Sequence, residues 1–456
     1  MSQGVIASSV NRVVVGLGIT GLSCARYLYR TGASFSVVDT RENPPGLEEL
    51  RSEMPEVPVY AGTYPPELIT GAAEAVVSPG IALDDPLVKL AKGAGVDVVG
   101  DIDLFMREAT APVIGITGSN AKSTVTELLG RMAREAGLVA GVGGNLGTPA
   151  LDLLDDANQL YILELSSFQL ERAGSLGLAV ATVLNVSADH LDRHGSMPRY
   201  HQAKHRIFRG CHKAVINRDD PLTVPLVADD VEQIAWTLGH PAMGRPGQAD
   251  FGLAEVEGQE CLCHGFDLLL PTSELAMPGR HNVANALAAL ALGYAAGIPL
   301  APMCNTLRTF TGLPHRCELV ATVGGVHYVD DSKGTNVGAT DAALRGLGAD
   351  RNILLIAGGQ GKGADFSQLR PAVEKHCKQL ILIGEDGPLI WKALRDVAPI
   401  ILCDTLEEAV EVAAAGAKPG DTVLLSPACA SFDMFSGFVA RGQAFSAAVK
   451  QLGDTA

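Results

Sequence analysis

Short runs of apolar residues alternate with segments of helical periodicity along most of the chain. The runs RVVVG at 12–16, SFSVVD at 34–39 and AEAVVS at 73–78 form a first series. APVIGITG at 111–118 opens a second series, and RNILLIAGG at 351–359 opens a third. Short apolar strands that alternate with helices are typical of parallel sheets covered on both faces. The pattern therefore predicts an α/β fold.

Two interruptions divide the three series. The first lies near Gly100, before a charged helical segment that leads into the strand at Pro112, and the second lies in TFTGLPHR, residues 309–316. At about 150 residues per domain, a chain of 456 residues is expected to form three domains. Residues 219–275 lose the strand–helix rhythm and predict an irregular antiparallel portion. The expected domains are a Rossmann-like half fold at 1–100, a central parallel sheet of the P-loop ATPase type at 101–312 and a Rossmann-like domain at 313–456.

The composition narrows the class of protein and its location. The formal net charge is −16, so any site for a polyanion must be built locally. The nine cysteines are scattered and form no CxxC pair, which predicts free thiols in a reducing compartment. The uncharged run at 282–307 contains prolines and predicts a packed helix and a turn rather than a membrane span. Since no cationic segment precedes an apolar core at the N-terminus, we expect no signal peptide and a cytoplasmic protein.

A first glycine-rich loop, GLGITG at 16–21, follows a strand and opens a helix. The glycines allow a pyrophosphate to approach backbone amides at a helix N-terminus, and Asp39 at the end of the next strand completes a dinucleotide-binding pattern. A dinucleotide fold requires two such halves, however, and only one precedes the next phosphate loop. The loop therefore favours a mononucleotide diphosphate over NAD, with the hydroxyls of Thr20 and Thr40 as further donors.

A second phosphate loop, GSNAKST at 118–124, also joins a strand to a helix. The strict Walker pattern fails, because Ile116 and Ala121 occupy its two glycine positions. The loop can still bind a nucleotide triphosphate, because Lys122 can neutralise β- and γ-phosphates and Ser123 or Thr124 can hold Mg²⁺. Because a positive φ costs Ala about 1 kcal/mol relative to Gly, we predict a negative φ at Ala121.

Polar side chains follow several predicted strands at the edge where parallel sheets bind ligands. Glu164 lies at the end of one apolar run and is an available ligand for Mg²⁺. The other groups are Asp189, His190, Asp192 and His194 after a second run, Asp330, Asp331 and Lys333 after a third, and Lys362 in a glycine-rich loop after a fourth. Each group alone fits a capped or solvated loop, but together with two phosphate loops they predict a functional site.

The motifs of the chain resemble those of the Mur ligase family. They are GLGITG, VVDTR, VSPG, GSNAKST, GGNLG, ELSSFQLE, NVSADHLDRH, PGRHNVANALAALAL, FTGLPHR, VDDSKGTN, GGQGK and LSPACASFDMF, and they run from Gly16 to Phe435. The resemblance implies an ATP-dependent ligase of peptidoglycan synthesis that joins D-glutamate to the alanyl carboxylate of UDP-N-acetylmuramoyl-L-alanine. The carboxylate would first become an acyl phosphate. Three domains would hold the UDP-linked substrate, ATP and the amino acid respectively.

The resemblance also assigns binding residues position by position. ATP would contact Gly118, Ser119, Asn120, Ala121, Lys122, Ser123, Thr124, Asn282, Asn285, Arg316 and Asp331. The UDP-linked substrate would contact Gly18, Ile19, Thr20, Asp39, Thr40, Ser78 and Asn145. D-glutamate would contact Lys333, Thr335, Lys362, Ser431, Phe432 and Phe438.

The catalytic and metal-binding residues that the resemblance implies overlap. The catalytic residues are Lys122, His190, Lys204 and Arg316. Of two Mg²⁺ sites, in which Mn²⁺ can substitute, one would use Ser123 and Glu164, and the other His190 and Lys204. Since a protonated lysine has no lone pair for a metal, the resemblance implies that CO₂ carbamylates Lys204 into a carboxylate-like ligand.

One position departs from the pattern of the family. Gln360 stands where related sequences more often have Asp, which puts in doubt a charge partner for Lys362. We also expect a hinge near Gly312, so that the third domain swings to bring the substrates together. The expected protein is a monomer that binds neither nucleic acid nor membrane.

The residues leave three alternatives open. The first is another Mur ligase or a folylpolyglutamate-type ligase, which shares the ATP loop and the hinge. The second is a nicotinamide oxidoreductase, based on GxGxxG and Asp39. The third is a nucleotide-binding regulator without catalytic activity.

Overall fold

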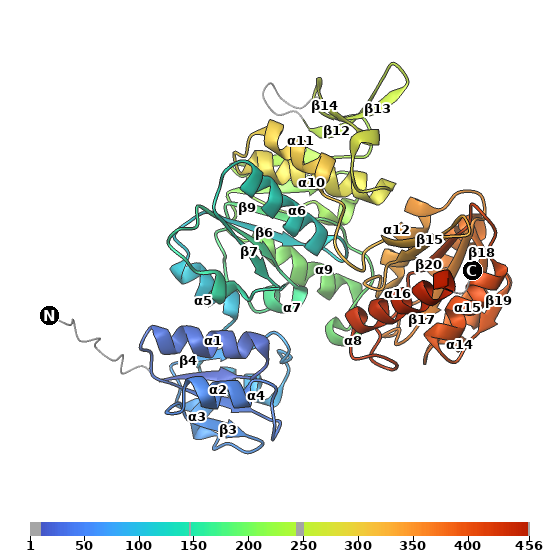
Figure 1. Ribbon diagram of the computed structural model, residues 1–456. Coiled ribbons are helices and arrows are strands. Elements are labelled where there is room, and N and C mark those ends of the chain that lie inside the picture. The colour runs from blue at the N-terminus through green and yellow to red at the C-terminus, as the bar shows by residue number, and fades with distance from the viewer. Residues whose placement is uncertain (1–10, 146, 243–249, 455–456) are drawn as a thin grey trace.

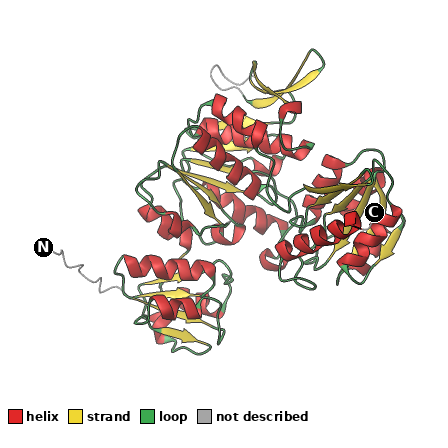
Figure 2. Cartoon of the chain, viewed as in Figure 1, coloured by secondary structure: helices red, strands yellow, loops and turns green. Residues whose placement is uncertain are grey.

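The computed structural model describes residues 11–145, 147–242 and 250–454. Residues 1–10, on which the expectation about a signal peptide depends, and Leu146 of the GGNLG motif lie outside this part of the chain. Three sheets follow one another along the chain, and helices flank the strands of each sheet (Figures 1 and 2). The predicted α/β fold class is confirmed.

The first sheet is parallel throughout and has the strand order β3-β2-β1-β4-β5. Its strands are β1 (Arg12–Val15), β2 (Phe35–Asp39), β3 (Val59–Ala61), β4 (Glu74–Val77) and β5 (Asp97–Val99). Its helices are α1 (Ile19–Arg30), α2 (Leu47–Glu53), α3 (Glu67–Thr70) and α4 (Pro86–Gly93), and α5 (Asp101–Glu108) leads into the second sheet. Val14 of the central strand pairs in register with Val37 and Val76, so the buried valines form one apolar layer.

The second sheet has nine strands in the order β14-β13-β12-β11-β10-β9-β6-β8-β7. They are β6 (Val113–Thr117), β7 (Ala140–Gly144), β8 (Leu160–Glu164), β9 (Val180–Val183), β10 (Lys213–Asn217), β11 (Glu232–Trp236), β12 (Phe251–Val256), β13 (Gln259–His264) and β14 (Asp267–Pro271). Antiparallel pairing joins β12 to β13 and β13 to β14, whereas β11 still pairs parallel with β10. The antiparallel portion therefore begins later than the predicted residue 219.

The helices of the second sheet position its ligand edge. They are α6 (Lys122–Glu135), α7 (Ser167–Leu170), α8 (Leu191–His194), α9 (Met197–His205), α10 (Arg280–Ala295) and α11 (Leu300–Thr309), with short 3₁₀ turns η1 (Ala150–Leu153), η2 (Arg206–Phe208), η3 (Pro221–Thr223) and η4 (Thr272–Glu274). Helix α10 packs on α6 and α11, which buries the alanines and leucines of its apolar segment. The uncharged run at 282–307 thus falls in two helices, and no described helix is both long and apolar enough to cross a membrane.

The third sheet has the order β15-β16-β20-β17-β18-β19, and β15 pairs antiparallel with β16 while the other strands are parallel. Its strands are β15 (Glu318–Val323), β16 (Val326–Asp330), β17 (Ile353–Gly358), β18 (Cys377–Ile383), β19 (Ile400–Leu402) and β20 (Thr422–Leu425). Its helices are η5 (Phe366–Leu369), α12 (Val337–Leu347), α13 (Arg370–His376), α14 (Gly387–Leu394), α15 (Leu406–Gly416) and α16 (Phe438–Asp454).

The first and second sheets share one apolar cluster and one buried cation. Helix α1 packs against η1, and Ser23 Oγ donates a hydrogen bond to Asp152 Oδ1 at 2.9 Å. Arg172, which follows α7, extends its guanidinium under the end of β4. It donates to the carbonyl oxygens of Val77 at 3.0 Å, Ser78 at 2.9 Å and Ile81 at 2.6 Å. The Ser78 carbonyl oxygen also accepts from the Ile81 amide at 3.0 Å, and the Ile81 carbonyl oxygen also accepts from Arg193 Nη2 at 2.8 Å, so Arg172 adds to the hydrogen bonds of this strand end.

Arg172→Met tests this connection. The substitution keeps an apolar stem but removes the guanidinium donor of the buried Val77 carbonyl oxygen and one of the two donors of the Ser78 and Ile81 carbonyl oxygens, so we expect the free energy of unfolding to fall by about 1–3 kcal/mol. Urea denaturation measures the change. Arg134→Met serves as the control, because Arg134 pairs with Glu127 on an exposed face and its loss should cost less than about 1 kcal/mol. Equal losses for the two variants would contradict the assignment.

Candidate active site

The second phosphate loop turns from β6 into α6 around a half-buried lysine. Lys122 Nζ donates to the carbonyl oxygens of Gly118 at 2.9 Å and Ser119 at 3.0 Å. Asn185 fixes the loop from the adjacent strand end, because its side-chain carbonyl accepts from the Asn120 amide at 2.8 Å. Burial lowers the pKa of Lys122, against the attraction of nearby carboxylates. The lysine is therefore held inside the loop, where an anion would stabilise its charge.

Ala121 is left-handed, so the predicted negative φ is wrong. Its φ is 66° at the position that precedes α6. The loop must turn sharply there before the helix begins, and the carbonyl of Ala121 accepts the first helical bond from Val125 N at 3.0 Å. The methyl group also packs against the apolar cluster that contains α6 and α10. The positive φ of Ala121 therefore costs about 1 kcal/mol of backbone strain, and the packing of its methyl group offsets this cost.

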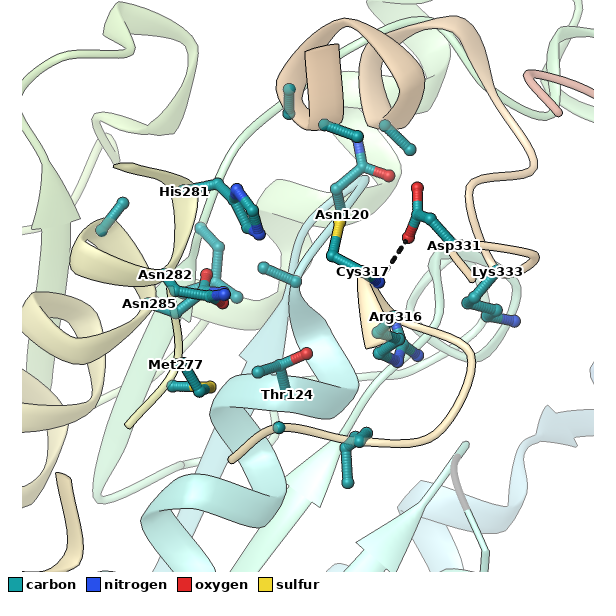
Figure 3. A pocket seen from close by; sticks show the side chains of 18 of the residues that line it. Asn120, Thr124, Met277, His281, Asn282, Asn285, Arg316, Cys317, Asp331 and Lys333 are labelled. Carbon is teal, nitrogen blue, oxygen red and sulfur yellow. Dashed lines mark hydrogen bonds between the residues drawn. The ribbon is translucent and has the colours of Figure 1, made fainter. Parts of the chain in front are cut away.

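A first cavity of about 210 Å³ lies between the phosphate loop, α10 and the segment that enters β15 (Figure 3). Asn120, Ala121, Thr124, Asn282, Asn285, Arg316 and Asp331 line it, as does Lys333. Asn285 Nδ2 donates to Asn282 Oδ1 at 3.0 Å, and Asn282 Nδ2 donates to the Pro278 carbonyl at 2.7 Å. The structure therefore brings seven of the predicted ATP-contacting residues to one cavity.

Arg316 reaches across from the third domain to the phosphate loop. Its Nη2 donates to Ser123 Oγ at 2.5 Å, although 193 positions separate the two residues. The flanking residues His315 and Cys317 both have a positive φ, 61° and 48°. His315 Nδ1 lies 2.7 Å from the buried Asp330 Oδ2, which fixes the ring beside the segment that enters β15. The guanidinium is thereby positioned by a strained but hydrogen-bonded segment.

Asp331 lies beside this segment and is about half protonated at neutral pH. Burial raises its pKa to about 7, and hydrogen bonding to Ser426 and the charge of Arg316 oppose the shift only in part. Ser426 Oγ lies 2.7 Å from Asp331 Oδ2, and the Cys317 amide donates to Asp331 Oδ1 at 3.3 Å.

A second cavity of about 310 Å³ adjoins the same loop and collects residues of the second and third domains. From the second domain come Ser119, Asn120, Ala121, Lys122, Ser123, Asn145, Glu164, His190 and Lys204. From the third domain come Arg316, Lys333, Thr335, Lys362, Ser431, Phe432 and Phe438. All the residues predicted to bind D-glutamate and all the predicted catalytic and metal-binding residues thus line one space.

Glu164 offers an unused ligand atom in this cavity. Asn145 Nδ2 donates to its Oε1 at 2.8 Å, whereas Oε2 is buried without a hydrogen-bond partner among the described residues. Lys204 lies nearby on α9, with Nζ 2.7 Å from the Gly118 carbonyl oxygen and 4.4 Å from the centre of the Tyr200 ring. Burial, and next the charge of Lys122, hold the pKa of Lys204 well below its usual range.

His190 and Asp189 follow β9 at the far wall of the second cavity. Burial lowers the pKa of His190 to about 4, so the imidazole is neutral at physiological pH, and the ring packs against Phe168 with centroids 4.9 Å apart. Burial opposes ionisation of Asp189, but the neighbouring His190, Lys362 and Lys122 outweigh it and keep the pKa of Asp189 below its usual range.

Lys362 finds its charge partner in the other domain. Its Nζ lies 3.6 Å from Asp189 Oδ1, while Gln360 Nε2 donates to Glu385 Oε2 at 3.2 Å and makes no bond to the lysine. Lys333 lies opposite, with Nζ 4.2 Å from the centre of the Phe438 ring, and burial lowers its pKa to about 8.

The first glycine-rich loop lies at the carboxyl edge of the first sheet. Gly21 has no room for a side chain, because a Cβ would meet the Gly16 carbonyl oxygen at 1.9 Å. Asp39 is buried and already paired: it accepts from the Leu17 amide at 2.7 Å and from Arg41 Nη2 at 2.7 Å. The carboxylate therefore orders the loop and holds Arg41, a cation that the sequence analysis did not single out.

The remaining members of the first loop surround this edge. Gly18 precedes the first turn of α1, and Ile19 and Thr20 form its first turn, where Ile19 is 77% exposed. Thr40 follows β2 and is exposed, and Ser78 follows β4 and donates from Oγ to the Gly16 carbonyl at 2.8 Å. Asn145 belongs to the second cavity instead, so the predicted substrate residues span the gap between the first sheet and the phosphate loop.

Family models match three successive parts of the chain. "Mur ligase MurD-like, N-terminal domain" matches residues 10–100, "Mur ligase middle domain" matches 116–293, and "Mur ligase, glutamate ligase domain" matches 315–429. The chain belongs to the Mur ligase family. A curated relative from Pseudomonas aeruginosa, named UDP-N-acetylmuramoylalanine--D-glutamate ligase, is 54% identical over 452 residues, which are 99% of this chain and 100% of the relative. The family predicted from the motifs is confirmed.

Solved structures of other Mur ligases share the fold. UDP-N-acetylmuramate-alanine ligase MurC from Thermotoga maritima aligns with a TM-score of 0.59 at 18% identity, over 98% of this chain and 100% of that chain. MurF ligase from the same organism, in complex with ADP, aligns with a TM-score of 0.57 at 16% identity, over 98% and 97% of the two chains. At such identities the likeness shows the common architecture alone.

The sequence analysis of this Mur ligase did not single out several residues that line the two cavities, among them Tyr200, His281, Cys317 and Asn336. Two of them had a signal, because His281 adjoins Asn282 in the PGRHNVAN motif and Asn336 ends the VDDSKGTN motif. No local pattern indicated Tyr200. Its hydroxyl lies 3.1 Å from the Oγ of Ser119, a residue far from it in the sequence.

Asp331→Asn should change the pH dependence of stability. Asp331 is protonated in the folded state up to about pH 7, whereas in the unfolded chain it ionises near its ordinary pKa of about 3.9. Its stability contribution therefore falls as pH rises between those values and stays constant above about 7. We expect the melting temperature of the variant relative to the wild type to rise from pH 4 to pH 7. A difference that is constant over this range would contradict the raised pKa.

Proposed function

We propose that this Mur ligase joins D-glutamate to UDP-N-acetylmuramoyl-L-alanine with consumption of ATP, in peptidoglycan synthesis. The observation that carries the proposal is the second cavity, where Lys122 and Arg316 at the phosphate loop face Lys362 across one space. The name of the P. aeruginosa relative supports the choice of substrates. Domain limits at 1–100, 101–312 and 313–456 would assign one substrate to each sheet.

The reaction explains why cations converge here. A carboxylate is a poor acyl donor, so an alanyl carboxylate oxygen attacks the γ-phosphorus of ATP and ADP leaves. The amine of D-glutamate then attacks the acyl carbon, loses a proton, and phosphate departs. The first step brings two anions together, and Lys122 and Arg316 would offset their repulsion. The 2.5 Å contact between Arg316 and Ser123 supports this role of the guanidinium.

ATP would occupy the first cavity. Its nucleoside would lie beside Asn282, Asn285 and Asp331. Its phosphates would lie on the loop from Gly118 through Ser119, Asn120, Ala121, Lys122 and Ser123 to Thr124, which lies between the first and the second cavity. The protonated form of Asp331, which is about half populated at neutral pH, suits a ribose, since a protonated carboxyl group both donates and accepts hydrogen bonds.

The UDP moiety would bind at the first glycine loop, where Gly18, Ile19, Thr20 and Thr40 surround the N-terminus of α1. The paired Asp39 supports an ordering role for this residue, and Ser78 ties the loop to β4. The alanyl carboxylate would then reach Asn145 and His190 at the second cavity.

D-glutamate would bind on the third domain, with its carboxylates near Lys362, Thr335 and Ser431. Lys333 lies against Phe438, which would shape the pocket together with Phe432.

The donor set fits two Mg²⁺ ions. Glu164 Oε2 is buried and unpaired, and Ser123 Oγ lies in the same cavity, so these oxygens would hold one ion. His190 is neutral and keeps a lone pair, and Lys204 would join it at the second ion after carbamylation. Mn²⁺ would substitute in both sites. Bound Mg²⁺ would neutralise charge on the phosphate oxygens.

The surroundings of Lys204 support its carbamylation. A neutral amine, not an ammonium, attacks CO₂, and the depressed pKa of Lys204 favours the neutral form. The resulting carboxylate would supply the oxygen that Mg²⁺ prefers.

We further propose a monomer that acts in the cytoplasm and binds neither nucleic acid nor membrane. All nine cysteines are free and eight are buried, which supports a reducing compartment.

Phosphate release with UDP-N-acetylmuramoyl-L-alanine and MgATP tests the function. We expect release with D-glutamate and background rates with L-glutamate, L-alanine, meso-diaminopimelate and L-lysine. Release with another amino acid would indicate a different Mur ligase activity. Absence of release with every amino acid would overturn the proposal, and thermal stabilisation by NADPH but not by the UDP-linked substrate would favour the oxidoreductase.

Lys204→Ala tests the carbamate. Loss of a metal ligand should lower activity at least about a hundredfold, and acetate or formate should restore part of it by replacing the missing carboxylate. Lys213→Ala provides the control, since Lys213 lies on the surface and pairs with Glu232. Failure of small carboxylates to restore activity, with normal folding and normal ATP binding, would count against the carbamate.

A further inference from the structure

Helix α12 of the third domain begins directly on the phosphate loop. Asn336 caps the helix, because its Oδ1 accepts from the Ala339 amide at 2.8 Å. The same side chain donates from Nδ2 to Asn120 Oδ1 at 3.0 Å and to Asp189 Oδ2 at 3.1 Å. One amide therefore joins the start of α12 to the tip of the phosphate loop and to the segment after β9.

Two further contacts lie beside this amide. Lys362 Nζ is 3.6 Å from Asp189 Oδ1. Gly338 approaches so closely that an added Cβ would meet Ser187 Oγ at 2.5 Å and Ser187 Cβ at 2.9 Å. The φ of Gly338 is not positive, so the close approach, and not the backbone conformation, requires glycine here. We name these contacts the α12 seam: Asn336, Gly338 and Lys362 against Asn120, Ser187 and Asp189.

We propose that the α12 seam is the docking surface that brings the amino acid to the phosphate loop, with Asn336 and Asp189 as its positioning residues. The choice of amino acid rests on the proposed function. The hydrogen bonds of Asn336 and the ion pair of Lys362 are polar and specific in direction, as a surface that opens and closes in each catalytic cycle requires. Docking would fix Asn120 at the loop tip and hold Lys362 at the cavity wall where the incoming carboxylate binds.

Gly338→Ala tests the seam without loss of the helix. Alanine is the better helix former, so α12 should not be weakened, but its methyl group would collide with Ser187 across the seam. We expect kcat for D-glutamate-dependent phosphate release to fall about a hundredfold, the scale of an ångström-sized misplacement, while the Kd for ATP stays unchanged. Ser187→Gly removes both colliding atoms and should restore kcat in the double variant. Gly93→Ala is the control, because Gly93 ends α4 with open space around it.

The outcomes separate the seam from the proposed function. Wild-type kcat in Gly338→Ala, or no recovery in the double variant, would overturn the seam. If the wild type released no phosphate, the proposed function would fail, and small-angle X-ray scattering with MgATP would decide the seam alone. A larger radius of gyration for Gly338→Ala than for the wild type, reversed by Ser187→Gly, would support it, and equal radii in all three proteins would overturn it.

Discussion

Repulsion between anions is the constraint around which this site is arranged. The chain carries a net charge of −16, yet Lys122, Lys204 and Arg316 are gathered at one phosphate loop, and burial depresses the pKa of each. Burial makes each of these charges costly, so an entering phosphate or carboxylate stabilises the cluster as much as the cluster stabilises the anion. In water, solvent dipoles would have to reorient around the reacting anions, whereas the folded protein holds these cations in place before the anions bind.

The two boundaries between domains differ in the kind of contact that holds them. The first and second sheets share a single apolar cluster, and Arg172 adds buried hydrogen bonds to it. Among the described residues, no apolar cluster joins the second and third sheets, although helix α10 packs against α12. The other contacts include hydrogen bonds such as that of Asn336 and the ion pair of Lys362 with Asp189. Apolar burial fixes relative position, and a polar boundary permits motion. This difference agrees with the proposal that D-glutamate binds on the third domain, whose boundary with the second domain permits motion.

The sequence predicted the layers and most of the side chains of the site, because both depend on local signals. Glu164 and Asp331 follow apolar runs, and parallel strands bring such ends to one edge. Ala121 was predicted wrongly, since its left-handed backbone is set by the turn into α6 and by packing that no local rule contains. The sequence also could not identify the charge partner of Lys362. Its position depends on how two domains dock, and a residue 173 positions earlier, Asp189, provides the charge that Gln360 does not.

The lysine of the phosphate loop and the lysine of the proposed carbamate share one hydrogen-bond acceptor. Lys122 and Lys204 both donate to the Gly118 carbonyl oxygen, at 2.9 Å and 2.7 Å. Two ammonium groups so close repel each other strongly in a buried site, and the repulsion is relieved when one of them is neutral. Lys204 is the more strongly depressed of the two, so its amine is the one available for CO₂. Carbamylation would then replace a repelling charge by an attracting one and hold Lys122 protonated for the phosphates.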